Sequence, residues 1–246
     1  MEIDAQSETV KSRFARVYGS PGESPRVIGI LKAFWPLLVI SLLFGYLFRA
    51  ALPIPSLSLS QLGLFFIFLA VIGVLLLAMG DRRLVNYLKG AQGEECVAQE
   101  LMFLSSEYSI FNGIRLDKSS YNIDHIVVGP TGVYVVETKN WSGRVYFQDG
   151  LVKIDGKKTD YFPLRQVKKE AYELNNFFKI NGMPQLSIKT VLCFVGSELD
   201  EPISNINGVI VCNKDSLIDV LTLELNDEID LENKNKANEI LISLLK

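Results

Sequence analysis

Hydrophobic residues are distributed unevenly along this chain, with two long apolar runs before a region of mixed pattern. The first run covers residues 33–48 and the second covers residues 62–80, and neither contains a charged residue. A helix needs about 20 residues to cross a bilayer core, so the second run is long enough unaided. The first run reaches this length if Lys32 or Arg49 snorkels to the interface. The pattern predicts two transmembrane helices within residues 28–80.

Positively charged residues flank the two runs on their outer sides, and only Arg49 lies between the runs. The positive-inside rule then predicts a two-pass protein of the inner cell membrane, with the lipid bilayer as a partner and both termini in the cytoplasm. Two buried core helices or a signal peptide are the alternatives. The absence of a polar face argues against the first alternative, and the absence of a cleavage site before the second run argues against the other. Residues 1–27 are then a cytoplasmic tail and residues 81–92 a linker.

From residue 93 onward the pattern is that of an α/β domain. Helical spacing predicts helices over residues 93–105, 163–180, 215–223 and 230–245. Alternation and β-branched residues predict strands over 108–116, 122–129, 132–139, 187–195 and 209–212, and a hairpin formed by 144–147 and 151–154. We therefore expect an α/β domain over residues 93–213, closed by helices in residues 214–246.

Composition and residue counts exclude several classes of protein and of metal site. A hydrophobic fraction of 48% beside a charged fraction of 22% excludes a disordered chain and a pure membrane bundle. The three cysteines form no CxxC pair and are odd in number, which argues against a disulfide framework or zinc ribbon and favours a reducing compartment. The single histidine, His125, excludes mechanisms that need two histidines, so metal chemistry would use carboxylates.

The most informative segment is a predicted hairpin around the turn at residues 129–132. A hairpin centred there pairs residues whose numbers sum to 261, which places Asp124 opposite Glu137 with Cβ atoms about 4.5–5.5 Å apart. Lys139 shares their face because strand side chains alternate. Opposed carboxylates require a cation. Either Lys139 supplies it in a structural salt-bridge cluster, or the carboxylates bind a divalent ion such as Mg²⁺ and Lys139 orients the attacking water.

Two further polar residues and a basic stretch extend this picture. Glu94 shares the apolar stripe of its helix with Val97 and Leu101, so it is either a partner of the helix dipole or a ligand. Gln166 is a candidate in the first turn of the 163–180 helix, or else an ordinary surface glutamine. Residues 139–169 hold eight cations against three acids, and this stretch is either an anion-binding face or a solvated surface. The candidate nucleic-acid contacts are Lys153, Lys157, Lys158, Arg165, Lys168 and Lys169.

Several of these elements together resemble the nuclease-related domain (NERD) family over residues 93–195. They are Gly93-Glu94 with Val97 and Leu101, Ile123-Asp124-His125, Gly129-Pro130-x-Gly132-Val133, Val136-Glu137-Thr138-Lys139, Gly143 and Pro163-Leu164-x-Gln166. That family is placed in the PD-(D/E)XK nuclease superfamily, whose restriction-endonuclease-like core is a mixed four-stranded sheet flanked by helices. Ile123 stands at the proline position of the superfamily motif.

The resemblance implies a role for each matching residue. Asp124, Glu137 and Glu94 would be the metal ligands, Lys139 the catalytic lysine and Gln166 the glutamine of the later helix. We therefore expect a membrane-anchored nuclease that uses Mg²⁺ or Mn²⁺ to hydrolyse phosphodiester bonds, in DNA rather than RNA.

Two other classes of function remain as alternatives. One is a non-catalytic nucleic-acid-binding or scaffolding module at the membrane. The other is an interaction protein whose acidic C-terminal segment, residues 230–246, recruits a partner. A homodimer is left open as well, since Gly45, Gly63 and Gly73 permit close helix packing.

Overall fold

The structure is a computed structural model. It divides the chain into two compact units, one formed by residues 1–23 and 92–246 and the other by residues 24–91. The structure describes residues 14–22, 27, 35, 38–47, 58, 60–61, 64–65, 67–68, 71–72, 82–116, 122–148, 151–159, 162–183, 186–223 and 229–245.

The unit of residues 24–91 holds the predicted membrane segments. Residues 38–47 are helical and all ten are exposed. Across the residues that the structure describes, no helix has both the length and the apolar composition needed to cross a membrane. The predicted anchor at residues 28–80 lies partly outside the described residues, so its membrane insertion stays a prediction.

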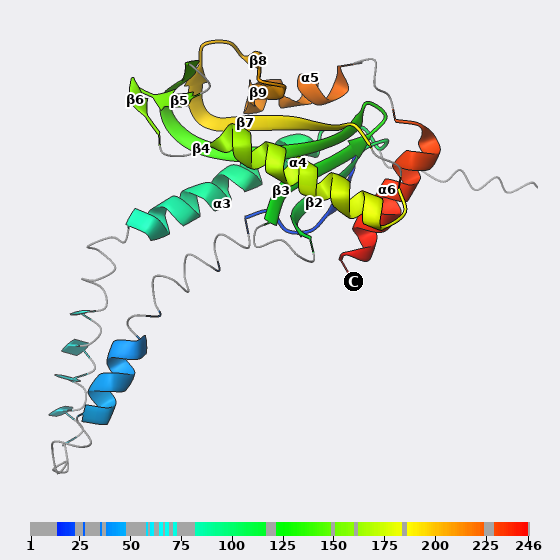
Figure 1. Ribbon diagram of the computed structural model, residues 1–246. Coiled ribbons are helices and arrows are strands. Elements are labelled where there is room, and N and C mark those ends of the chain that lie inside the picture. Colours follow the sequence, from blue (N-terminus) through cyan, green and yellow to red (C-terminus); the bar gives the residue numbers. More distant parts are fainter. Residues whose placement is uncertain are drawn as a thin grey trace, which may run out of the picture. The chain divides into compact units, whose positions relative to one another are not determined.

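The strands of the other unit form one mixed sheet. Within the described ranges it has nine strands, in the order β1-β2-β3-β4-β7-β9-β8, and β5 and β6 branch from β4 (Figure 1). The strand bounds are β1 Arg16–Tyr18, β2 Ser109–Arg115, β3 Asn122–Gly129, β4 Gly132–Gln148, β5 Leu151–Ile154, β6 Lys157–Lys158, β7 Ile188–Leu199, β8 Ile203–Ile206 and β9 Val209–Asn213.

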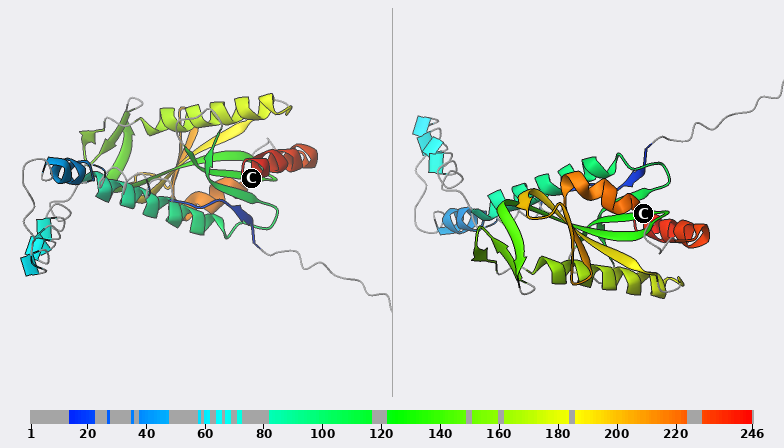
Figure 2. Two further views of the ribbon diagram at one scale, coloured as in Figure 1. Left: turned by 90° about the horizontal axis from the view of Figure 1, so that it is seen from below. Right: turned by 90° about the horizontal axis from the view of Figure 1, so that it is seen from above.

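Helices cover both faces of this sheet. Their bounds are α3 Arg82–Leu101, α4 Pro163–Ile180, the short 3₁₀ helix η1 Lys214–Ser216, α5 Leu217–Thr222 and α6 Leu231–Ser243. Figure 2 shows α3 and α4 on opposite sides of the strands. One apolar core joins α4 and α6 to the sheet, and a second joins α3 and α5 to the opposite face. The predicted fold class, a mixed sheet flanked by helices, is confirmed for this unit.

The centre of the sheet combines both pairing directions. Strands β2, β3 and β4 are antiparallel neighbours, while β4, β7 and β9 run parallel. Parallel neighbours need a long crossover, and α4 lies within the crossover from β4 to β7. This arrangement brings the first turns of α4 over the strand that carries Glu137 and Lys139.

The register of the β3–β4 hairpin agrees with the sequence prediction. Its pairs run from Gly129–Gly132 to His125–Val136, and the numbers of each pair sum to 261. The length of a hairpin's turn sets its register, and here the turn is Gly-Pro-Thr-Gly. A slip of one residue would turn each strand side chain to the opposite face of the sheet.

Some element bounds differ from the prediction. The predicted strand 144–147 is the continuation of β4, which passes through a bulge between Asn140 and Gly143. Gly143 has a φ of 95°, a value that glycine adopts without strain. Helix α3 begins at Arg82, before the predicted start at Gly93, and ends at Leu101. The three short strands β1, β6 and β8 were not predicted.

Candidate active site

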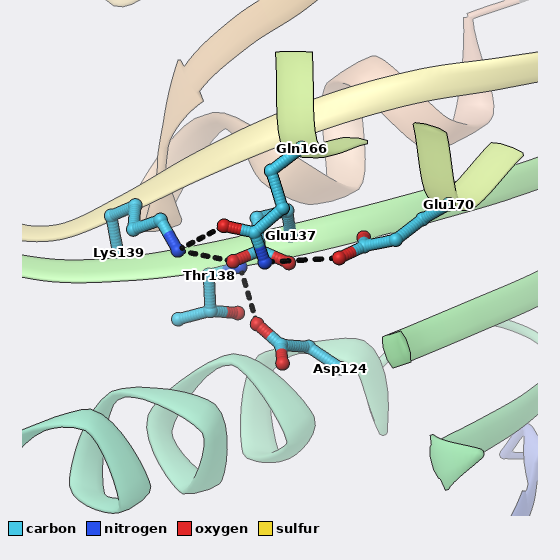
Figure 3. Close-up of polar contacts among 6 residues, drawn as sticks. All are labelled: Asp124, Glu137, Thr138, Lys139, Gln166 and Glu170. Atoms are coloured by element: carbon cyan, nitrogen blue, oxygen red, sulfur yellow. Dashed lines mark hydrogen bonds and ion pairs between the residues drawn. The ribbon is translucent and has the colours of Figure 1, made fainter. Parts of the chain in front are cut away.

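The Lys139 side chain contacts residues on two elements, the strand β4 that carries it and the helix α4. Lys139 follows Glu137 by two residues on β4, so both side chains lie on one face of the sheet. Its ammonium forms an ion pair with Oε1 of Glu137 and donates a hydrogen bond of 3.1 Å to Oε1 of Gln166 on α4 (Figure 3). The Glu137 side chain is 2% exposed and the Lys139 side chain 18% exposed. Lys139 is therefore the member of the ion pair that a substrate can reach.

Gln166 connects Lys139 to a further acid, Glu170. Nε2 of Gln166 donates a hydrogen bond of 2.9 Å to Oε1 of Glu170, one turn later on α4 (Figure 3). Glu170 is fully buried, although it stands in a run of charged residues and was not predicted as a site residue. Its helical spacing was the available signal, because Glu170 lies three residues after Val167 and four before Leu174 on the buried stripe of α4.

Asp124 lies beside this network, where the β3–β4 ladder ends. The last ladder pair is His125–Val136. One position further, Oδ2 of Asp124 accepts a hydrogen bond of 2.9 Å from the backbone N–H of Thr138 (Figure 3). Since Thr138 separates Glu137 from Lys139, this bond fixes the Asp124 carboxylate next to both residues.

Glu94 reaches the region from α3, and Gly93 permits the approach of that helix. A Cβ atom at position 93 would lie 2.7 Å from Cβ of Asn140 on β4, so a larger residue would push the helix away from the strand. Glu94 is half-buried, and its Oε2 accepts a hydrogen bond of 2.9 Å from the backbone N–H of Gly22. The short segment after β1 therefore helps to position this acid.

Burial and repulsion disfavour negative charge on these acids. Burial, followed by the charge of Glu137, raises the pKa of Glu170 to about 10. Burial is also the main cause that raises the pKa of Glu94 to about 7 and the pKa of Asp124 well above its usual range, and Glu137 adds to both shifts. Burial opposes the charge of Lys139 too, but Glu137 and Asp124 outweigh it and raise the pKa of that ammonium. The folded site therefore favours the protonated forms of Glu94, Asp124 and Glu170.

The donor set fits a hard divalent cation. One carboxylate oxygen of Glu137 and one of Glu170 are buried without a hydrogen-bond partner in the described part of the chain. Carboxylate oxygens are the ligands that Mg²⁺ and Mn²⁺ prefer. Over the same described ranges, no three His, Cys, Asp or Glu side chains form a group already arranged to hold an ion. The convergence of Glu94, Asp124 and Glu137 on one ion stays a prediction.

His125 has a structural environment. It is fully buried, and its Nδ1 lies 2.8 Å from Oδ1 of Asn112, its cross-strand neighbour on β2. Burial lowers the pKa of His125 to about 3, so the ring is neutral at physiological pH. These contacts give His125 a role in holding β2 and β3 together.

The six cations predicted to contact nucleic acid occupy a small sheet extension and one helix. Three lie on the paired strands β5 and β6, and three lie on α4. Three of the six contact neighbouring side chains: Lys169 lies 3.9 Å from Glu173, Lys153 donates a hydrogen bond to Gln148, and Arg165 lies over the Phe162 ring. Arg165 and Lys168 line a pocket between β5 and the start of α4.

Comparison with known proteins finds a family match over the segment that contains these residues. Residues 89–195 match the NERD family, described as the nuclease-related domain. This range contains β2 to β6, α4, most of β7 and the C-terminal part of α3, so the segment similar to the nuclease-related domain includes most of the sheet. An uncharacterized protein of Bacillus anthracis is 39% identical over 62 residues, which is 24% of this chain and 29% of that relative. The match therefore spans less than a third of the relative. No solved structure matches this chain.

Proposed function

We propose that this protein is a membrane-anchored nuclease that hydrolyses phosphodiester bonds in DNA and depends on Mg²⁺ or Mn²⁺. The observation that carries the proposal is the position of the Lys139 ammonium. It lies between the Glu137 carboxylate and the Gln166 amide, beside Asp124. The match of residues 89–195 to the nuclease-related domain supports the same chemistry.

Five residues of the candidate active site have a role in the proposed reaction. Asp124, Glu137 and Glu94 would hold the ion, which when bound stabilises the negative charge that develops on the phosphate oxygens. Lys139 keeps its proton at neutral pH because Glu137 and Asp124 raise its pKa. It therefore acts as a charged donor toward the phosphate or the attacking water, and Gln166 orients it.

The proposed anchor is residues 28–80, with both termini in the cytoplasm and the protein in the inner membrane. Two observations support this part of the proposal. The apolar runs carry flanking positive charges on their outer sides. The helical residues 38–47 also expose large apolar side chains, including Leu38, Leu42 and Tyr46, which water does not solvate well.

A cleavage assay tests the activity. The full chain, purified in detergent, is incubated with single- and double-stranded DNA and with RNA of the same sequence, in Mg²⁺, Mn²⁺ or EDTA. We expect DNA to be cut in either metal and left intact in EDTA. Intact DNA in both metals would contradict the proposed activity. Cutting of RNA alone would contradict the proposal that DNA is the substrate.

A non-catalytic nucleic-acid-binding module at the membrane is the second candidate. It is supported by the exposed side chains of Lys157, Lys158 and Lys168, for which the described residues provide no ionic partner. This candidate predicts binding whose affinity falls steeply with salt, without cleavage in any metal. Gel-shift and cleavage assays on one preparation separate the two candidates.

A further inference from the structure

A pocket of about 340 Å³ opens between β5 and the first turns of α4. Its lining is apolar where Val152 and Leu164 contribute, and both of these side chains are buried. Its remaining lining includes Phe162, Arg165 and Lys168. The pocket thus has an apolar interior and an edge with an aromatic ring and two cations. Such a lining suits a ligand in which a flat apolar group is attached to a negatively charged group.

Phe162 lines this pocket, and hydrogen bonds hold its backbone. Its carbonyl oxygen accepts hydrogen bonds from the N–H groups of Arg165 at 3.0 Å and Gln166 at 3.1 Å, so the residue is held at the start of α4. The residue is nevertheless 53% exposed. The Arg165 guanidinium lies 5.8 Å from the ring centroid, in the position of a cation–π partner. An exposed, positioned aromatic ring is a stacking surface for a second flat group.

The charge around the ring is positive. Arg165 and Lys168 are exposed and form no ion pair with the acidic side chains that the structure describes. The strand β5, which lines the pocket, pairs with β6, and Lys153 and Lys158 are partners in that pairing. A ligand with phosphate groups would therefore meet two cations, Arg165 and Lys168, in the lining that also holds Phe162.

The pocket also lies next to the candidate active site along the helix. Arg165 directly precedes Gln166, whose side chain contacts Lys139 at 3.1 Å. Arg165 therefore lines the pocket, whereas its neighbour Gln166 contacts the carboxylate network. The first turn of α4 therefore contributes one residue to the pocket and the next residue to the contact with Lys139.

We infer that this pocket binds an unpaired base next to the phosphate that is cut. The base stacks on the Phe162 ring, and Arg165 and Lys168 contact the neighbouring phosphates. Stacking on an aromatic side chain needs a base that has left the duplex, so the preferred substrate class is single-stranded or locally opened nucleic acid. This inference rests on the proposed function, because it assigns a substrate class to the same site.

Binding in EDTA tests the inference without cleavage. The full chain in detergent is titrated with a single-stranded DNA oligonucleotide that contains the fluorescent base 2-aminopurine, and with the corresponding duplex. Phe162→Ala should weaken binding of the single strand by roughly tenfold and abolish quenching of the probe, because an aromatic stack of this kind is lost. Phe162→Trp should restore both. Duplex binding should change much less.

Phe103→Ala is the matched control, since Phe103 is 71% exposed and lies outside the pocket. It should bind the single strand as the unmodified chain does, and circular dichroism should show that all variants are folded. Equal binding by Phe162→Ala and the unmodified chain would overturn the inference. Equal competition by poly-glutamate and by the oligonucleotide would also overturn it, because the surface would then recognise only charge or acidic peptides.

The binding and cleavage results are separable. Base-dependent binding without cleavage in Mg²⁺ or Mn²⁺ would support the pocket and contradict the nuclease. Cleavage with a Phe162→Ala variant that binds normally would support the nuclease and overturn the pocket.

Discussion

The amide of Gln166 holds the ammonium of Lys139 through a hydrogen bond of 3.1 Å that joins α4 to β4. The same amide donates to Glu170, so one side chain fixes a cation on one side and a buried acid on the other. Because Lys139 can also rotate about a long flexible stem, Gln166 limits where its charge is presented. Gln166 is therefore a positioning residue for Lys139.

Replacing this amide should lower activity without unfolding the protein. Gln166→Leu keeps a similar size but removes both hydrogen bonds, and Gln166 is exposed, so little packing is lost. Loss of a hydrogen bond to a charged group corresponds to a decrease in cleavage rate of roughly ten- to a hundredfold. Gln99→Leu, an exposed glutamine on α3, should cleave normally. An unchanged rate in Gln166→Leu would show that Lys139 needs no such support.

The close approach of α3 to β4 gives a stability prediction. Gly93→Ala places a Cβ atom 2.7 Å from Cβ of Asn140 and should lower the free energy of unfolding by about 1–3 kcal/mol. Gly90→Ala, in the same helix, meets no atom within 4 Å and should raise it by up to about 1 kcal/mol. Urea denaturation of both variants measures the difference. A similar change in the two would mean that the helix does not depend on this contact.

The burial of Glu170 predicts a dependence of stability on pH. Its pKa is raised from 4.5 to about 10, so between these values the folded protein holds a proton that the unfolded chain has released. Stability should then fall as the pH rises through this window, with a slope of at most about 1.4 kcal/mol per pH unit from this group. Urea midpoints measured in EDTA at several pH values should show a smaller slope in Glu170→Gln.

Glu173→Gln is the control for that experiment. Glu173 lies on the same helix and its side chain is 29% exposed beside Lys169. Its replacement should leave the slope unchanged. If Glu170→Gln kept the slope of the unmodified chain, the acid would be ionised in the folded state, contrary to its burial.

The N-terminal strand should contribute to the stability of the sheet. Tyr18 on β1 stacks on Phe111 of β2 with ring centroids 4.9 Å apart and an interplanar angle of 12°. Tyr18→Ala should cost at least about 1 kcal/mol through loss of this stack and its packing. Val17→Ala on the same strand, 42% exposed, should cost less. Equal urea midpoints for Tyr18→Ala and the unmodified chain would contradict the packing of β1.

Sequence reasoning succeeded where local pattern determines structure. The register of β3 and β4 follows from one four-residue turn, so the pairs from Gly129–Gly132 to His125–Val136 were predictable. Helix α4 has a proline at its first position and one apolar stripe, and its predicted bounds are those of the structure. The shared face of Glu137 and Lys139 follows from their spacing alone.

Contacts between distant segments were not predictable. β1 has three residues and no distinctive pattern, and it exists as a strand because β2 lies beside it. The bond from Gly22 to Glu94 joins positions 72 residues apart. Glu170 was missed for a different reason: a charged residue normally faces water, and only the network with Gln166 shows why this one is buried.

Cleavage by Glu137→Gln shows whether the β4 carboxylate belongs to a metal-dependent catalytic centre. The substitution keeps the shape of the side chain and removes its charge, and thermal unfolding should confirm that the variant is folded. Glu198→Gln, an exposed acid on β7, is the matched control. In Mg²⁺ we predict that the control cuts an end-labelled DNA at the rate of the unmodified chain, while Glu137→Gln leaves it intact. Cleavage by Glu137→Gln at the control rate would show that the Glu137 carboxylate has no part in a metal-dependent catalytic centre.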